Sequence, residues 1–487
     1  MKAKFSTLLL AVLLVVGTAA GSGWLAYNYL NQDLTGMSAE DINAFKEEHP
    51  KVNVTYTITI EGGSELLELA ENTSSVKLEN AVQVSDLVNK SAYLYNLSSI
   101  DLSNITLTPA EAEAVQQAFP HAQDLIITHL SILGSSYPLT TEEVDLSSMT
   151  PDMLDTAVEE LKYLPALSAI NLMDANGGTN FSMDDALKLK NACPDVTVQY
   201  AFDLLGVPVS HETESLEYAR RYIGDAGVDT IRKALPLMPK LSYLKLDDCG
   251  TTDETMAQLR ADFPNIEVHW RIFYSVFDCM TDNYKLWTIG GLMDKQIVDF
   301  VHLRGLRYLD LGHNCFTHLD FMKDLKYLDT VILAHGTLED ISGIKDCSTI
   351  TFLEIFSNRK LDNEDMQNLS GLVNMEYLNI SNLPLVTDLS FTDNMPKLKK
   401  LWCTLSNVPQ SEIDRVKALH PDCEFVFMSQ GDPTDYGWRK NPDGSYVARY
   451  ALLREQIGYE RDDVSQYPKG ELKELITYES TGITPDE

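Results

Sequence analysis

Two histidines at equivalent places in a spacing pattern are the residues best suited to chemistry in this 487-residue chain. His313 and His335 are 22 residues apart and follow the same arrangement of aliphatic residues. If the two copies of the arrangement form neighbouring strands, the imidazoles stand about 5 Å apart. His318 and Asp320 follow nearby, and two stacked imidazoles with a carboxylate could hold a divalent metal. The other interpretation is a pair of ordinary turn histidines, and we therefore expect no metal site.

No catalytic signature accompanies these histidines. The sequence has no Gly-x-Ser-x-Gly elbow, no His-Glu-x-x-His, no phosphate-binding loop and no Cys-x-x-Cys. The acidic pairs Asp247-Asp248 and Asp462-Asp463 are sequence neighbours, whereas glycosidase carboxylates must face each other across a substrate. We interpret both pairs as solvated surface charge. The sequence therefore predicts a protein that is not an enzyme and needs no cofactor.

The arrangement that positions the histidines occurs five times between residues 303 and 403. Each copy has aliphatic-type residues at its first, fourth, seventh and ninth positions. The copies are offset by 22, 22, 25 and 23 residues, and they begin at Leu303, Leu325, Cys347, Leu372 and Met395. Apolar residues two apart place both side chains on one face of a strand. Each copy therefore predicts one short strand.

This spacing resembles the leucine-rich repeat family, whose consensus is L-x-x-L-x-L-x-x-N/C-x-L. Asn314 and Asn358 stand at the consensus asparagine, where a buried amide can satisfy backbone groups in the turn that leaves the strand. The resemblance is strong over residues 303–403 and covers most of residues 40–428. It implies a horseshoe-like solenoid with a broad concave sheet, a fold that usually binds other molecules.

A second signature divides the earlier part of the chain into modules of about 70 residues. A helix-like run ends in an aromatic residue, His or Cys, then proline, then an alternating strand, because proline cannot continue a helix. The five prolines are Pro50, Pro120, Pro194, Pro264 and Pro421. Further strands recur between them, and a helix is expected from Thr150, which could cap it, through Leu161. We therefore predict an α/β solenoid with one continuous parallel sheet, helix-backed in its first two thirds.

The N-terminal segment is predicted to be a signal anchor or a signal peptide. Lys2 and Lys4 precede 28 uncharged residues that end at Gln32. Small residues at 17–20 could form a cleavage site, whereas apolar and aromatic character resumes at 24–30. Either interpretation places the remaining chain outside the cytoplasm. We expect a single-pass membrane protein with an extracellular C-terminal region, or a secreted protein if the segment is cleaved.

Four regions are predicted: residues 1–32 as the signal anchor or signal peptide, 33–300 as the long helix-containing modules, 301–428 as the short repeats and 429–487 as a C-terminal cap and acidic tail. The tail contains a helix-like run over residues 446–456. Its apolar side chains could cover the exposed end of the solenoid; they are Tyr436, Trp438, Tyr446, Tyr450 and Leu453. The whole pattern resembles extracellular, membrane-anchored repeat proteins of Gram-positive bacteria.

The charge balance restricts the partners. The chain has 72 acidic and 38 basic residues, a formal net charge of −34. Nucleic acid is excluded, because phosphate binding needs a basic surface. Anionic lipid headgroups are disfavoured for the same reason, so membrane contact is expected through the N-terminal segment only. A protein or peptide ligand remains.

The seven cysteines are expected to be mostly free thiols. Cys347 and Cys403 occupy repeat positions normally held by leucine, and Cys249 stands at the Asn/Cys position of its repeat. The alternative is a single surface disulfide that involves Cys279 or Cys315.

An aromatic cluster on the concave face is the candidate site. Side chains between the buried leucines of each repeat point out of the sheet. We expect them to face solvent and to bind the partner, since exposed aromatic clusters mark interaction surfaces. The predicted partner-binding residues are Tyr308, Ile332, Phe352, Glu354, Phe356, Tyr377 and Trp402. Two alternatives are that the tail folds back over this cluster, or that the face is assigned one residue out of step.

Two functions from different classes follow. The first is an extracellular, membrane-tethered leucine-rich repeat protein that binds a protein or peptide through its concave face. The second is a structural or scaffold component of the cell envelope without a dedicated ligand site. An uncovered aromatic face favours binding, whereas coverage by residues 432–460 favours the scaffold.

Overall fold

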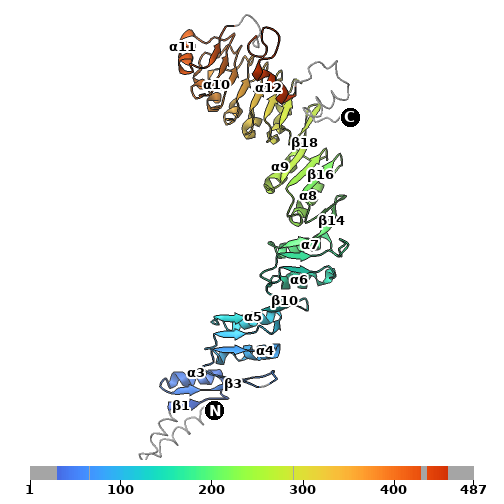
Figure 1. Ribbon diagram of the computed structural model, residues 1–487, viewed down its shortest axis with the longest axis vertical. Helices are drawn as coiled ribbons and strands as arrows, with labels where there is room; N and C mark the ends of the chain where they lie inside the picture. The colour runs from blue at the N-terminus through green and yellow to red at the C-terminus, as the bar shows by residue number, and fades with distance from the viewer. Residues whose placement is uncertain (1–29, 65, 289, 429–435, 459–487) are drawn as a thin grey trace, which may run out of the picture. The chain divides into compact units, whose positions relative to one another are not determined.

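The computed structural model describes residues 30–64, 66–288, 290–428 and 436–458. The predicted signal segment therefore lies almost wholly outside the described residues, as does the acidic stretch beyond 458. Within the described ranges, no helix has both the length and the apolar character needed to cross a bilayer. The chain divides into two compact units (Figure 1), Met1–His211 with Pro236–Pro239, and Glu212–Leu235 with Lys240–Glu487.

The first unit repeats one pattern of parallel strands alternating with helices, followed by a hairpin. It opens with the parallel pair β1 (Asn31–Asp33) and β2 (Asn53–Thr55), joined by α3 (Ala39–Glu48), before the hairpin β3 (Thr57–Ile60) and β4 (Leu67–Ala70). The next module is β5 (Ser75–Lys77), α4 (Ala81–Asn89), β6 (Ser99–Asp101), β7 (Thr106–Leu107), α5 (Pro109–Ala118) and β8 (Asp124–Ile126), with the hairpin β9 (His129–Ile132) and β10 (Ser135–Pro138). The last is β11 (Glu143–Asp145), α6 (Leu154–Leu161), β12 (Ala169–Asn171), α7 (Met183–Ala192) and β13 (Thr197–Gln199), with the hairpin β14 (Ala201–Leu204) and β15 (Val207–Ser210).

The proline signature is confirmed as a helix terminator. Five helices of ten residues end two residues before a proline, so that a single capping residue separates helix and proline. They are α3, α5, α7, α9 (Asp253–Asp262) and α11 (Gln410–Leu419). That capping residue has φ between −127° at His49 and −121° at His420, outside the helical region because proline restricts its predecessor. Its N–H still donates to the carbonyl four residues earlier. In contrast, Thr150 makes no side-chain capping bond, and the turn that follows is a 3-10 turn, Pro151–Met153.

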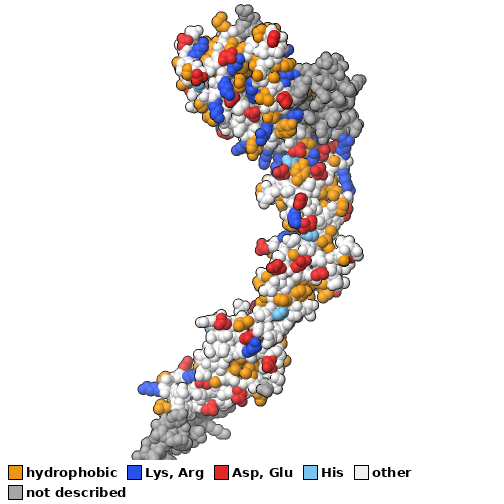
Figure 2. Space-filling view, in the orientation of Figure 1, with side chains coloured by type: hydrophobic (Ala, Val, Ile, Leu, Met, Phe, Trp, Pro, Cys, Tyr) orange, Lys and Arg blue, Asp and Glu red, His pale blue; other side chains and the backbone are white. Residues whose placement is uncertain are grey.

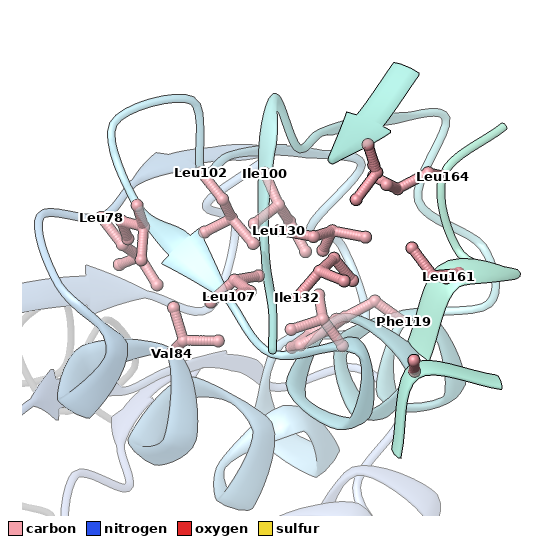
Figure 3. Packing of buried hydrophobic residues seen from close by; sticks show 14 of the residues in the cluster. Leu78, Val84, Ile100, Leu102, Leu107, Phe119, Leu130, Ile132, Leu161 and Leu164 are labelled. Carbon is pink, nitrogen blue, oxygen red and sulfur yellow. The ribbon is translucent and has the colours of Figure 1, made fainter. Parts of the chain in front are cut away.

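The core of the first unit is a stack of aliphatic side chains between strands and helices (Figure 3). Leu102 comes from the end of β6, Ile132 from β9 and Leu161 from α6, and all three are fully buried. Each such side chain contributes roughly 1.5–3 kcal/mol to folding. The aliphatic pattern read from the sequence is therefore the core of this unit.

The prediction of one continuous parallel sheet is wrong, because a hairpin follows each group of parallel strands. The strands form several separate sheets. At the tips, Leu133 and Gly134 have φ of 52° and 76°, and Leu205 and Gly206 have 53° and 82°. Positive φ at both central residues is the type I′ turn, whose twist matches that of the flanking strands. The antiparallel strand of each hairpin interrupts the parallel stack.

The second unit begins with one more long module and continues as the short repeats. The module contains β16 (Ser215–Ala219), α8 (Gly224–Ala234), β17 (Tyr243–Asp247), α9, β18 (Glu267–Tyr274) and β19 (Phe277–Met280). A seven-stranded parallel sheet follows, with strands β20 (Lys285–Trp287), β21 (Tyr308–Asp310), β22 (Thr330–Ile332), β23 (Phe352–Glu354), β24 (Tyr377–Asn379), β25 (Lys400–Trp402) and β26 (Glu424–Val426). Short 3-10 turns connect most strands, while α10 (Asn363–Met366) and α11 are helical.

The two consensus asparagines are buried and bonded as predicted. The Asn358 amide donates to the carbonyls of Leu333 and Ile355 at 2.8 and 2.9 Å, and its oxygen accepts from the N–H of Leu338. Asn314 bonds its own turn and the preceding repeat in the same way. Each asparagine thus joins two neighbouring repeats through backbone groups that would otherwise be buried without partners.

The turn after each strand adopts a left-handed backbone conformation that the sequence analysis did not predict. One non-glycine residue per repeat has φ between 53° and 61°. Its N–H donates to a carbonyl of the next repeat in four of the five cases. The five residues are His313, His335, Ser357, Asn382 and Leu405. This turn sets the direction of the chain as it leaves the sheet.

Candidate binding face and its C-terminal segment

Strand register confirms the face assignment made from the sequence. Tyr308, Thr330 and Phe352 are paired across β21, β22 and β23, and Tyr377 and Lys400 continue this row. The intervening residues Leu309, Val331, Leu353, Leu378 and Leu401 are fully buried on the opposite face. We call the first face the outer face of the seven-stranded sheet; it is the face that the sequence analysis describes as concave.

The expectation that the aromatic residues of the outer face contact solvent is wrong. Phe352 is 2% exposed, Phe356 0% and Trp402 3%. Ile332 and Glu354 are buried as well, and Tyr308 and Tyr377 are half-buried. All seven predicted site residues are therefore buried or half-buried beneath another part of the molecule.

That part is the chain's own C-terminal segment, which we define as residues 436–458. It consists of a turn and helix α12 (Ala448–Ile457), which contacts β20 and β21 (Figure 1). Four of its side chains join the outer face in one apolar cluster: Trp438, Tyr450, Leu453 and Ile457. The segment therefore lies on the face of the sheet and not on the end of the solenoid, and Tyr436 is 64% exposed instead of covering anything.

The centre of the contact is polar and has one acidic member. Glu354 is 0% exposed, and one of its carboxylate oxygens accepts a hydrogen bond of 2.6 Å from the Trp438 indole N–H. The Arg439 guanidinium forms an ion pair with the same carboxylate, with its Nε 3.1 Å from Oε1. Burial alone would lower the pKa of Arg439, but the Glu354 carboxylate raises it above its ordinary value. Arg439 therefore stays charged in the contact.

Aromatic rings surround this ion pair. The Trp438 ring lies 5.4 Å from Phe352 and 6.0 Å from Trp402, while Arg439 lies over Phe356 at 5.6 Å. Such offset aromatic and cation–π contacts each add roughly 0.5–1.5 kcal/mol beyond area burial.

A second arginine holds the helical part of the segment. The Arg449 guanidinium lies 4.9 Å from the Phe352 ring centroid and donates to the Thr330 hydroxyl at 3.0 Å. Lys400, from the sheet, donates to the Gly437 carbonyl at 2.5 Å. Together with the contacts of α12 to β20 and β21, the contacts of the segment therefore run from β20 to β25 and involve side chains of both the segment and the sheet.

A second acidic residue of the outer face is titratable near neutrality. Burial raises the pKa of the Asp310 carboxyl to about 7, and the nearby Glu354 charge adds to this rise. A backbone hydrogen bond from Gly312, 2.8 Å long, and the Arg439 charge act in the opposite direction. Asp310 thus changes charge beneath the C-terminal segment in the physiological pH range.

The two histidines stack as the repeat spacing predicts. Their ring centroids are 4.7 Å apart with an angle of 17° between the planes, and His335 also meets Phe356 edge-on at 4.9 Å. Both histidines are exposed. In the part of the chain that the structure describes, no group of three or more His, Cys, Asp or Glu side chains could hold a metal ion.

All seven cysteines lie among the described residues and all are free thiols, which confirms the expectation from repeat positions. Cys347, Cys403 and Cys249 are buried, as is Cys279, and Cys315 is exposed. The proposed surface disulfide involving Cys279 or Cys315 is therefore absent.

The roles of Arg439 and Arg449 in the C-terminal segment are not among the sequence-based predictions, which include Trp438 as a covering residue. A compositional signal was present: residues 436–458 contain four basic and two acidic residues within a chain of net charge −34. A basic segment within an acidic chain predicts an acidic docking surface.

No protein-family model matches the sequence, and no curated protein matches it. Solved structures with similarity include an internalin from Listeria monocytogenes, at 15% identity over 69% of this chain and 76% of that chain with a TM-score of 0.28. Internalin C2 from the same organism has 23% identity over 29% and 72%, with a TM-score of 0.22. A leucine-rich repeat protein from Leptospira interrogans has 13% identity over 83% and 91%, with a TM-score of 0.25.

The short repeats of this chain have a leucine-rich-repeat fold. Their own geometry defines it, through the parallel register of seven strands, the buried asparagines and the left-handed turn repeated after each strand.

Proposed function

We propose that this protein is an extracellular, membrane-tethered interaction protein that binds a polypeptide partner on the outer face of its short repeats. One observation carries the proposal: the outer face holds a polypeptide segment with interface chemistry. Trp438, Arg439 and Arg449 are of the residue types that dominate binding hot spots, and all three contact the outer face. A cap serving only to exclude water would need no buried carboxylate at its centre.

The second candidate is the scaffold, and the coverage of the face favours it. Residues 436–458 are part of the same chain; Phe352, Phe356 and Trp402 are buried in the cluster that they form with this segment, and Tyr308 and Tyr377 are half-buried against it. If this contact is permanent, the outer face has no external ligand and the C-terminal segment is a structural element. The two candidates thus differ in whether any other polypeptide reaches the face.

Site-specific photocrosslinking in the cells that produce the protein tests the proposal. A photoreactive residue replaces Tyr377, which is half-buried on the outer face; a control replaces Lys360, which is exposed in a turn between strands. We expect a crosslink from position 377, and not from 360, to a second polypeptide. That polypeptide must give the same crosslink when it is added to the purified full-length chain.

Crosslinks from position 377 that reach only residues 436–458 of the same chain would contradict binding and support the scaffold. Mass spectrometry of the crosslinked peptides distinguishes the two results.

A further inference from the structure

We infer that residues 436–458 are a tethered ligand of the outer face, and that the external partner is a basic polypeptide segment with a tryptophan next to an arginine. This inference rests on the proposed function and names the chemistry of the partner. Glu354 is the residue that selects this chemistry. The C-terminal segment competes with the partner for the same surface.

Glu354 is an acidic residue at the centre of the contact. Its position in β23 points out of the sheet, so without the C-terminal segment its carboxylate would contact water. With the segment docked, the carboxylate is completely buried and is matched by the Trp438 N–H and the Arg439 guanidinium. Burying a charge is unfavourable unless it is paired and fully hydrogen-bonded. The outer face therefore rejects segments that lack a cation and a donor at this place.

The C-terminal segment and the rest of the chain have opposite charge balances. The whole chain has a net charge of −34, whereas the C-terminal segment has an excess of basic residues. Asp310 and Glu354 are the acidic side chains near Arg439. Burial lowers the pKa of Arg449, and the nearby Asp329 and Glu376 carboxylates act in the opposite direction. A second copy of this acidic chain is repelled as a partner, and a basic polypeptide is attracted.

The docked segment leaves one buried donor of the outer face unsatisfied. Trp402 is 3% exposed, and its indole N–H has no acceptor among the described residues. An unpaired buried donor is unfavourable, because it has lost its hydrogen bonds to water without gaining another. An external segment that presents a carbonyl or carboxylate oxygen to Trp402 would bind more tightly than the tethered one.

The experiment uses the full-length chain and a labelled synthetic peptide of residues 436–458. The acceptor is a variant with Trp438→Ala and Arg439→Ala, which removes both partners of the Glu354 carboxylate from the segment and leaves every residue of the outer face unchanged. Lys440→Ala is the matched control, because Lys440 is the next basic residue but is exposed and lies over Tyr446 of its own segment. Binding is measured by fluorescence anisotropy, and folding of each variant by circular dichroism during heating.

We expect the peptide to bind the double variant. Wild type and Lys440→Ala should bind it at least tenfold more weakly, because a tethered segment has an effective concentration of about millimolar. Adding Glu354→Gln to the double variant should weaken binding at least tenfold, and so should Arg439→Ala in the peptide. Both changes together should weaken binding no more than either alone, which is the mark of a direct contact.

Three results would overturn the inference: no binding to a folded double variant, equal binding to wild type, or loss of the main thermal transition in the double variant. The last would make the segment an integral part of the solenoid. If the peptide binds but photocrosslinking finds no second polypeptide, the proposed function fails and the tethered contact stands. If a second polypeptide is found but the peptide does not bind, only the present inference fails.

Discussion

At the scale of single residues, the burial of Glu354 and the identity of its partner could not be predicted from the sequence alone. Glu354 has the same spacing as its neighbours in other repeats, and nothing in the sequence shows that it will be buried. Its partner Trp438 is 84 residues further along the chain. Contacts over such a separation follow from tertiary packing, which no local pattern encodes.

Asp310 makes docking of the C-terminal segment depend on pH. Its pKa is about 7 when the segment covers it, whereas an exposed aspartate has a pKa of about 3.9. Because the docked form holds the proton more tightly, docking is favoured at low pH and weakens as pH rises from about 4 to about 7. We expect the affinity of the 436–458 peptide for the double variant to fall at least about tenfold between pH 5 and 7.5.

Asp310→Asn is the control for this pH effect, because an amide keeps the shape of the side chain without titrating. Affinity that depends on pH equally with and without the Asp310→Asn substitution would assign the effect to another group.

Asn358 tests the bond between neighbouring repeats. Asn358→Ala leaves the Leu338 N–H and the carbonyls of Leu333 and Ile355 without their amide partner inside the core. We expect a loss of about 3 kcal/mol in the free energy of unfolding, measured by urea titration. Asn374→Ala, which removes two exposed bonds, one to the Ser348 carbonyl and one from Lys397, should change it by less than about 0.5 kcal/mol. Equal effects of the two substitutions would show that burial of the amide is unimportant.

At the scale of elements, the sequence predicted most strands and the helices before each proline. Apolar periodicity and proline position are local signals, and the structure places β2, β8, β13, β18 and β26 directly after their Pro-containing turns. The hairpins were missed although a signal existed, since Leu133-Gly134 and Leu205-Gly206 each stand between alternating residues. The division of the strands into separate sheets follows from those hairpins.

Of the candidate site, the sequence predicted the face and its residues but not their cover. Alternation within a strand fixes which side chains share a face, and the register confirms it for Phe352 and Tyr377. Whether a face is open depends on segments distant in sequence, and here Tyr450 and Leu453 close it.

Gly134 tests the hairpin turn. Its φ is 76°, and an added Cβ would meet no atom within 4 Å, so only backbone strain opposes a side chain there. We expect Gly134→Val to lower the free energy of unfolding by about 1–2 kcal/mol in urea titration. Gly305 has equal space but no positive φ, and Gly305→Val should cost much less. A similar loss at both positions would refute the role of the turn.

At the scale of the whole molecule, stability comes from the repeated burial of aliphatic side chains and not from crosslinks. Acidic and basic side chains are interspersed on the visible surface (Figure 2), and the seven cysteines form no bridge. Repeat proteins of this kind are stabilised by contacts between neighbouring units.

Thiol labelling tests this property across the chain. Denatured, unreduced protein should take up alkylating reagent at all seven cysteines, as counted by mass spectrometry. In the native protein, Cys315 should react first because it is exposed, and Cys279 last because burial raises its pKa and excludes the reagent. Two or more cysteines that stay unlabelled in the denatured state would reveal a disulfide.

The long sequence separation between Glu354 and Trp438 also orders events in time. A ribosome adds roughly 5–20 residues per second, so about 4–17 seconds pass between the synthesis of these two residues. During that interval Phe352 and Phe356 have no cover, and Trp402 has none from its own synthesis until the C-terminal segment follows. A nascent chain therefore passes through a stage in which its aromatic outer face is exposed. Any truncated product that stops before residue 436 stays at that stage, prone to aggregation and accessible to quality-control proteases.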